Sequence, residues 1–179
     1  MLKHYARQRG FSLIELMIAV TIFGIVLVLG LPSFSEWIQT QQLRVATEAA
    51  LNGLQVARAE AIRRNLPVQI VFGPGTAWTA TEVASAEQVQ SRPAAEGSAN
   101  AVLTVTPLGA TTVTFTPLGS VTTNADASAI VTQLDITNPT GGNCQPAGPM
   151  RCLRVLVTGG GNLKMCDPIV VAPDARGCS

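Results

Sequence analysis

Histidine is almost absent from this chain, which has only His4 in 179 residues. Hydrolases of the Ser-His-Asp or Cys-His kind need an imidazole base beside the nucleophile. The stretch Gly159 to Gly161 lacks the Lys-Ser/Thr pair of a phosphate-binding loop, so we expect a simple loop between strands there. Four aspartates are scattered among expected strand ends and turns, where Asp commonly shapes the turn: Asp126, Asp135, Asp167 and Asp174. The sequence therefore predicts no catalytic residues, no cofactor and no enzyme activity.

Charged residues are also few, at 13% of the chain, and positive charge does not dominate. Of the 12 lysines and arginines, three (Lys3, Arg7 and Arg9) precede residue 10, which leaves nine against 11 aspartates and glutamates. The chain therefore lacks the globally basic character of a typical nucleic-acid-binding domain.

What the chain does have is a run of almost wholly apolar residues from Phe11 to Leu31. A helix of that length is sufficient to cross the hydrocarbon layer of a bilayer. Glu15 is the only formal charge in the run, and an isolated acid within a membrane costs about 3 kcal/mol or more even on mild insertion scales. Such an acid needs a partner, so Glu15 is a candidate functional residue.

The basic leader before this run ends at Gly10, and the run itself offers no polar, small-residue exit of the kind that follows an ordinary signal peptide. Cleavage between Gly10 and Phe11 would leave the apolar helix in place and create a new amine at Phe11. That amine can neutralise Glu15 of another copy of the chain. Because Lys and Arg beside a membrane span stay cytoplasmic, everything after Pro32 is expected to be exported.

The segment Gly10-Phe11-Ser12-Leu13-Ile14-Glu15 resembles the type III prepilin signal of type IV pilins and type II secretion pseudopilins. The resemblance implies removal of residues 1–10 by a prepilin peptidase at the cytoplasmic face, N-methylation of Phe11, and assembly of the helices into a filament core. Glu15 would then recruit subunits by pairing with the amine of Phe11 in a neighbour. The alternative is a plain membrane anchor with a chance glutamate.

Four cysteines all lie in the last quarter of the exported part: Cys144, Cys152, Cys166 and Cys178. An even number in an oxidising compartment predicts disulfides, and four cysteines leave three connectivities open. The short spacings favour Cys144–Cys152 and Cys166–Cys178. No metal is expected, because a zinc site is disfavoured by the lack of a Cys-x-x-Cys pair and of any histidine after the leader.

Beyond the apolar run, residues 33–66 are expected to continue the helix as an amphipathic segment that ends near Arg64. Glu60 and Arg64 are spaced for a favourable i,i+4 ion pair. Pro32 lacks an N–H, so a kink or a locally unwound stretch is expected there. Apolar or small residues recur in steps of three and four, which makes one stripe that can cover a sheet: Leu43, Ala46, Ala50, Leu54, Ala57 and Ala61.

After residue 66, short runs rich in Val, Thr and Ile predict an antiparallel β domain over residues 67–179. The tetrapeptide Thr-Pro-Leu-Gly occurs at Thr106 to Gly109 and at Thr116 to Gly119, which favours a meander with two similar turns. Polar residues from Ser85 to Asn100 predict a surface loop. The expected strands are Val68–Phe72, Trp78–Val83, Ala101–Thr106, Thr111–Thr116, Ala129–Ile136, Cys152–Thr158 and Ile169–Ala172.

The stretch from Ala57 to Val68, with Ala-Arg-x-Glu-Ala-Ile before the first strand, resembles the GspH/FimT/FimU-like minor pilins and pseudopilins. The resemblance implies a pilin-like α+β fold, in which a long N-terminal helix, transmembrane over residues 11–32 and then amphipathic, packs against antiparallel sheets. It implies a minor pilin of a type IV pilus or of its tip or initiation complex. The subunit would be anchored by a single pass in the bacterial inner membrane, with its globular domain on the periplasmic side.

Two alternatives to this function remain, a minor pseudopilin of the type II secretion system and a DNA-binding competence pilin. Related pilins of the FimT kind contact DNA near the carboxyl end. From residue 140 onward this chain has four basic residues against Asp167 and Asp174, a surplus of two. The basic residues that would contact DNA are Arg151, Arg154, Lys164 and Arg176. Few phosphate contacts give weak, salt-sensitive binding, so nucleic acid is not the favoured partner.

Overall fold

The computed structural model describes residues 11–94 and 96–178, apart from the side chains of residues 29–33. The chain divides into two compact units, residues 1–35 and 36–179. One helix is followed by strands in an α+β arrangement, as predicted. The elements are α1 (Leu13–Arg64), β1 (Val68–Phe72), β2 (Trp78–Glu82), β3 (Gln88–Arg92), β4 (Val102–Thr106), β5 (Thr112–Phe115), β6 (Val121–Thr122), β7 (Gln133–Thr137), the 3-10 helix η1 (Pro139–Gly141), β8 (Leu153–Val157) and β9 (Leu163–Cys166).

In the first unit, α1 is apolar around its circumference, and every residue from Phe11 to Val28 is exposed. The helix is continuous through Pro32, so the locally unwound stretch expected there does not occur. A proline removes a single backbone N–H donor from a helix, and the residues on both sides of Pro32 keep the helical conformation of α1. Among the residues that the structure describes, no helix has the length and hydropathy needed to cross a membrane.

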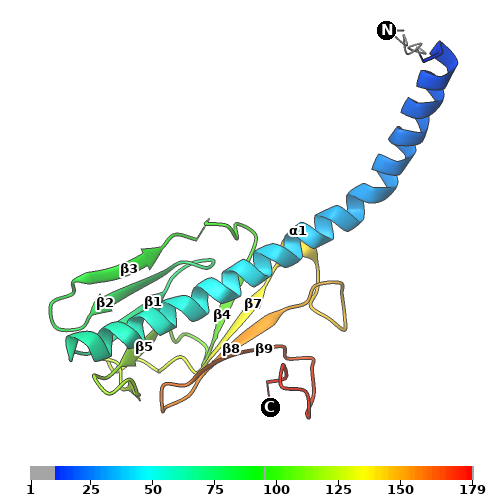
Figure 1. The fold of residues 1–179 in the computed structure, drawn as a ribbon. Helices are drawn as coiled ribbons and strands as arrows, with labels where there is room; N and C mark the ends of the chain where they lie inside the picture. Colours follow the sequence, from blue (N-terminus) through cyan, green and yellow to red (C-terminus); the bar gives the residue numbers. More distant parts are fainter. Residues whose placement is uncertain (1–10, 95, 179) are drawn as a thin grey trace, which may run out of the picture. The chain divides into compact units, whose positions relative to one another are not determined.

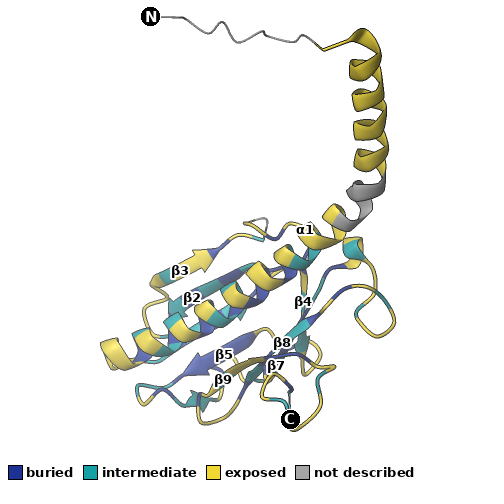
Figure 2. Cartoon of the chain, turned by 45° about the vertical axis from the view of Figure 1, so that its right-hand side comes forward, coloured by how far each residue is buried: buried dark blue, intermediate teal, exposed yellow. Residues whose placement is uncertain are grey.

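In the second unit, α1 buries the predicted stripe against the strands, and Figure 2 shows buried and exposed residues alternating along this part of the helix. The six stripe residues are each at most 2% exposed: Leu43, Ala46, Ala50, Leu54, Ala57 and Ala61. Four of the six are alanines, and such small side chains allow the helix axis to come close to the sheets. The helical period therefore predicted the packed face correctly.

The carboxyl end of α1 is closed by a left-handed residue. Asn65 has φ of +54°. Its N–H donates to the Ile62 carbonyl, and the Leu66 N–H donates to the Ala61 carbonyl, both at 3.3 Å. These two bonds form a Schellman motif, which satisfies carbonyls that the helix would otherwise leave open. Pro67 follows and cannot continue the helix, so the chain turns directly into β1.

The strands form two antiparallel sheets, and the part of α1 drawn in cyan in Figure 1 runs alongside them. The first sheet has the order β3-β2-β1-β5-β6, and the second has the order β4-β7-β8-β9. Buried residues from both sheets, such as Ile70 and Phe115 in the first and Leu134 and Val155 in the second, share one core with Leu54 of α1. A single helix therefore covers apolar faces of two sheets.

The predicted meander is wrong at one of its two turns. Thr116 to Gly119 joins β5 to its partner β6, with the Gly119 N–H donating to the Thr116 carbonyl at 2.8 Å. Thr106 to Gly109 instead connects β4, in the second sheet, to β5, which pairs with β1 in the first. The same tetrapeptide therefore serves as a hairpin turn and as a crossover between sheets.

Five predicted strands agree with β1, β2, β4, β5 and β8 to within one residue at each end, whereas β7 starts four residues later than expected. The segment Ile169–Ala172 is not a strand. It is flanked by Pro168 and Pro173, which cannot donate to a ladder. β3 lies inside the expected surface loop, and β6 and β9 were not predicted. β3 is mostly exposed at the edge of its sheet and has no alternating apolar pattern by which it could be recognised.

Candidate functional site

The expected assembly residues Phe11 and Glu15 lie together at the start of α1, with Phe11 two residues before the helix begins and Glu15 in its first turn. They line a shallow, almost wholly apolar groove of about 470 Å³. The lining residues are Phe11, Glu15, Leu16, Ala19, Val20 and Phe23, and from Glu15 onward their spacing is that of one helical face. Gly10, the other half of the expected cleavage bond, lies outside the described residues. Glu15 is thus the one acidic residue lining this apolar groove. It lies beside Phe11, and cleavage after Gly10 would give Phe11 a free amine.

Ser12 caps the start of α1 through the backbone N–H of Glu15, a local contact that was not among the sequence predictions. The Ser12 hydroxyl accepts a hydrogen bond from the Glu15 N–H at 3.2 Å, and the Leu16 N–H donates to the Ser12 carbonyl at 3.1 Å. This is the Ser half of a Ser-x-x-Glu capping box, and the helix dipole favours an acid in the first turn. The signal was present in the sequence as Ser12-Leu13-Ile14-Glu15. Any test of Glu15 must therefore separate helix capping from subunit pairing.

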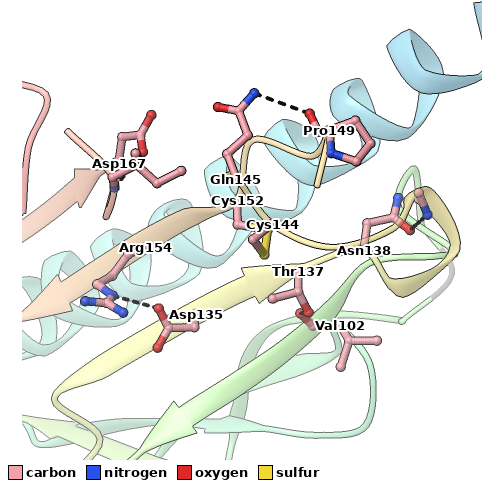
Figure 3. The surroundings of a disulfide bond; sticks show 12 residues. Val102, Asp135, Thr137, Asn138, Cys144, Gln145, Pro149, Cys152, Arg154 and Asp167 are labelled. Carbon is pink, nitrogen blue, oxygen red and sulfur yellow. Dashed lines mark hydrogen bonds and ion pairs between the residues drawn. A yellow bond between two sulfur atoms is a disulfide. The ribbon is translucent and has the colours of Figure 1, made fainter. Parts of the chain in front are cut away.

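All four cysteines form disulfides, with the connectivity that the short spacings favoured. Cys144 pairs with Cys152 across 5.4 Å between Cα atoms, and Cys166 pairs with Cys178 across 5.1 Å. Figure 3 shows the first bond, close to β7 and β8. Within residues 11–94 and 96–178, no three His, Cys, Asp or Glu side chains are grouped closely enough to hold a metal ion.

The arginines predicted to contact DNA are each in an ion pair with an aspartate. Nε of Arg151 lies 2.7 Å from Asp167, and Nη2 of Arg176 lies 2.6 Å from Asp174. Nε of Arg154 lies 2.6 Å from Asp135 on β7 (Figure 3). Hydrogen bonds from Arg176 lower the pKa of Asp174 to about 2, so that this acid stays ionised. The count of charges from residue 140 onward left out Asp135. When Asp135 is included, four basic residues stand against three acids, and the expected surplus of two positive charges falls to one.

The structure does not bring these four basic residues together on one surface. Arg154 and Leu156 alternate with the buried Val155 on β8, and Lys164 is opposite Leu156 in the ladder. Directly opposed residues share a face, so Arg154 and Lys164 belong to the face turned away from the core. Arg151, before β8, instead lines a groove on the side of α1. The candidate DNA residues are therefore divided between two surfaces.

The groove that contains Arg151 lies in the second unit and has a volume of about 350 Å³. One wall is a turn of α1, and β8, β9 and the C-terminal loop supply the rest. Its lining residues are Thr40, Gln41, Arg44, Arg151, Leu153, Met165, Cys166, Asp167 and Arg176. It combines apolar side chains with three arginines that come from three separate parts of the chain.

Three of the four aspartates shape turns, as expected. Asp126, Asp167 and Asp174 each accept a hydrogen bond from the N–H two residues later, at 2.9, 3.1 and 2.9 Å. Asp135 differs, because it lies in the middle of β7. The turn interpretation is therefore wrong for that residue, whose role is the ion pair with Arg154.

The segment that resembled minor pilins, Ala57 to Val68, ties the helix to distant loops. Nε of Arg58 donates to the Gly119 carbonyl at 3.0 Å. A Cβ placed on Gly161, whose φ is +79°, would lie 1.9 Å from that same carbonyl oxygen. Glycine is therefore required at 161 both by its conformation and by the close approach. No local signal in the sequence indicates this junction of α1, the Thr116–Gly119 turn and the β8–β9 loop.

Arg64, at the end of the helix, joins three acids. It lies 2.9 Å from Glu60, as the i,i+4 spacing predicted, and also 3.5 Å from Glu82 and 3.2 Å from Glu87. Hydrogen bonds from Arg63, and then from Arg64, lower the pKa of Glu60 to about 2. The motif thus fixes the helix end to the β2–β3 hairpin.

Residues 46–161 match the family described as Type II transport protein GspH. This segment is well over half of the chain. The chain belongs to the GspH family. Residues 5–31 separately match the prokaryotic N-terminal methylation motif. The two resemblances noted in the sequence, at Gly10 to Glu15 and at Ala57 to Val68, are thereby confirmed.

The fold of this GspH-family chain is similar to that of the type IV minor pilin FimU of Pseudomonas aeruginosa, seen in two crystal structures. Each gives a TM-score of 0.50 at 16% sequence identity. The similarity covers 69% of this chain and 87% or 91% of the FimU chain. At this identity the comparison concerns the fold alone, and it confirms the pilin-like arrangement of a long helix on antiparallel sheets.

The groove extends beyond the segment that defines the GspH family. Arg151 and Leu153 lie inside the matched residues 46–161, whereas Arg44, Met165 and Arg176 lie outside them. The residues of the N-terminal site, by contrast, all fall within the methylation motif. The GspH-family chain therefore combines an N-terminal site that a known motif covers with a groove that the family match covers only in part.

Proposed function

We propose that this GspH-family chain is a minor pilin, which is added to a type IV pilus or to its tip or initiation complex. A prepilin peptidase would cut between Gly10 and Phe11, and Phe11 would be N-methylated. The observation that carries the proposal is that Phe11 and Glu15 line the same apolar groove at the start of α1, within the methylation motif. Glu15 in lipid is tolerable only with a partner, and the amine of a neighbouring Phe11 supplies one.

The proposal includes the environment of the subunit. Residues 11–32 would anchor it by a single pass in the bacterial inner membrane, with the second unit on the periplasmic side. The exposure of the apolar side chains from Phe11 to Val28 supports this, because such a helix needs lipid or neighbouring helices around it. Its partners would be other pilin subunits, whose apolar helices replace the lipid upon assembly.

A second candidate is a minor pseudopilin of the type II secretion system. It is favoured by the description of the matched family, Type II transport protein GspH. Processing and the pairing of Glu15 would be the same in both systems, so the two candidates differ in the fibre that receives the subunit. Deleting the pilus assembly genes or the secretion genes of the host, one set at a time, shows which fibre takes it up.

The proposal is tested by substituting Glu15 in cells that contain the peptidase and the assembly system. Glu15→Val should insert and be cleaved normally, but it should be depleted from sheared fibres because the amine of its neighbour has no partner. Intact mass should show loss of residues 1–10 and gain of one methyl group. Ser12→Ala is the matched control, since it removes the helix cap and keeps the carboxylate. Normal incorporation of Glu15→Val, or a mature chain that still begins at Met1, would refute the proposal.

A further inference from the structure

The groove of the second unit is bounded on one side by an exposed face of α1. Thr40, Gln41 and Arg44 line it. Trp37 precedes them at the spacing of the same helical face, because residues i, i+3, i+4 and i+7 are neighbours on a helix. Trp37 is 58% exposed, whereas the other tryptophan, Trp78, is 2% exposed. The helical turn next to the groove therefore carries a large, exposed aromatic residue.

The floor of the groove is an uncovered part of the second sheet. Met165 on β9 is opposite Val155 on β8, so it belongs to the core-facing side of that sheet. Val155 is fully buried, but Met165 is 37% exposed. β9 is the last strand of the sheet, and at this strand the cover of the apolar face is incomplete. An apolar occupant would complete the layer that α1 begins.

The arginines at the rim of the groove have N–H donors that other described residues do not use. Among the hydrogen bonds between described residues, Arg44 donates only through Nε, to Glu48, and Arg151 only through Nε, to Asp167. The terminal Nη groups of both arginines are left for a further acceptor. Arginine forms bidentate bonds with carboxylates through such groups. The rim is thus suited to acidic side chains, and the floor to apolar ones.

We propose that this groove docks a segment of a neighbouring fibre subunit in which carboxylate and apolar side chains alternate, with Trp37 and Met165 as the apolar contacts and Arg44 and Arg151 as the acid-binding groups. The proposal rests on the proposed function, because it assumes a fibre. Trp, Met and Arg are the residues that protein interfaces favour in their cores.

Charge balance argues for a peptide rather than for nucleic acid. The three arginines of the groove face Glu48, Asp167 and Asp174, so the surface has donor groups without a net positive charge. A duplex, whose binding depends on neutralising many phosphates, gains little there. A peptide with a few carboxylates and apolar side chains uses both the donors and the apolar floor.

Direct binding tests the proposal without any fibre. The full chain in detergent micelles is titrated with a fluorescein-labelled peptide of alternating Asp and Leu, and with the same peptide carrying Lys for Asp. We expect the acidic peptide to bind at least about tenfold tighter and to shield Trp37 from acrylamide. Arg44→Glu and Met165→Glu should each lose about tenfold in affinity. Arg151 is kept, because its loss would leave Asp167, whose side chain is 6% exposed, without its ion pair.

Asn162→Glu is the matched control, since it adds the same charge to the same hairpin at an exposed position outside the groove. It should bind the acidic peptide within about twofold of the unaltered chain. Equal affinity for the two peptides, or equal loss in the control, would overturn the proposal. Shielding of Trp37 by anionic liposomes with no competition from the peptide would identify a lipid-facing surface and would overturn it as well.

A second arm measures incorporation into sheared fibres. Met165→Glu should be cleaved and methylated normally yet be depleted about tenfold relative to Asn162→Glu. Full incorporation of Met165→Glu would contradict the docking role. The Glu15→Val experiment keeps the two proposals apart: if Glu15→Val is incorporated while the acidic peptide binds the groove, the assembly role of Glu15 fails and the peptide site stands.

Discussion

Gly53 of α1 lies directly against the indole ring of Trp78 on β2. A Cβ placed on Gly53 would come within 2.7 Å of Cε2 of that ring. The indole N–H has no hydrogen-bond partner in the part of the chain that the structure describes, so packing alone positions the ring. The glycine therefore sets how closely the helix approaches the first sheet.

Gly53→Ala is predicted to destabilise the protein, although alanine is the better helix former. The helical gain is about 1 kcal/mol, whereas forcing a methyl group into a packed contact typically costs about 1–3 kcal/mol. We expect the free energy of unfolding to fall by up to about 2 kcal/mol. Urea unfolding of the full chain in micelles, followed by tryptophan fluorescence, measures it.

Gly160→Ala is the control for this prediction. A Cβ there meets nothing within 4 Å, and the φ of Gly160 is not left-handed. It should change the free energy of unfolding by less than about 0.5 kcal/mol. If the two alanine variants are equally stable, the close contact between Gly53 and Trp78 is not a constraint on the fold.

Acid is predicted to loosen the junction at the end of α1 through Glu60. The pKa of Glu60 falls from 4.5 to about 2 in the folded chain, because Arg63 and then Arg64 donate hydrogen bonds to its carboxylate. A depressed folded-state pKa gives stability that is fully present above pH 4.5 and is lost as the pH falls toward 2. Glu60→Gln should flatten the pH dependence of unfolding in that window. Arg63→Gln should flatten it too, and combining both changes should add little, since they remove one interaction.

The helix was predictable because its signal is long and repeated. Six stripe residues from Leu43 to Ala61 define the buried face without reference to any other part of the chain. β1, with its apolar alternation, was equally clear. β3 was not, because Gln88 to Arg92 is polar and depends on β2 for its pairing. Local sequence also does not reveal that the turn at Thr106 leads into another sheet, since that is decided by the packing of β5 against β1.

In the candidate site, too, contacts between residues close in sequence were predictable and contacts between distant residues were not. Ser12 and Glu15 are three residues apart, so their capping contact was readable from the sequence. The contact of Arg58 with Gly119 spans 61 residues and could not be predicted from the sequence. Counting charges after residue 140 likewise missed Asp135, which a strand register brings to Arg154. Residue counts give the composition of a surface, but the pleat decides which side each residue faces.

The Cys166–Cys178 disulfide is predicted to hold the C-terminal rim of the groove. The loop between these cysteines contains Asp167 and Arg176, and the Asp167 N–H donates to the Arg176 carbonyl at 2.7 Å. Replacing both cysteines with serine should cost about 2–4 kcal/mol of stability. It should also weaken binding of the acidic peptide. Cys144→Ser/Cys152→Ser, by contrast, should lower the stability and leave binding of the peptide unchanged. Thiol labelling of the denatured, unreduced chain should find no reactive cysteine, and labelling at any of the four would contradict the pairing.

Duplex DNA is predicted to bind this chain only weakly, with Kd of about 10⁻⁴ to 10⁻⁶ M at physiological salt. Each of the three arginines in the predicted DNA set is paired with an aspartate, and one flat contact cannot engage both faces of the second sheet. Arg176→Gln, on the side of the groove, and Arg154→Gln/Lys164→Gln, on the opposite face, should therefore each reduce binding by only a small factor. Titration of the full chain with duplex DNA at two salt concentrations measures this. Sub-micromolar binding that only one of these two variants abolishes would show instead that a single face of the sheet is a DNA-binding surface, and it would favour the competence pilin over the structural subunit.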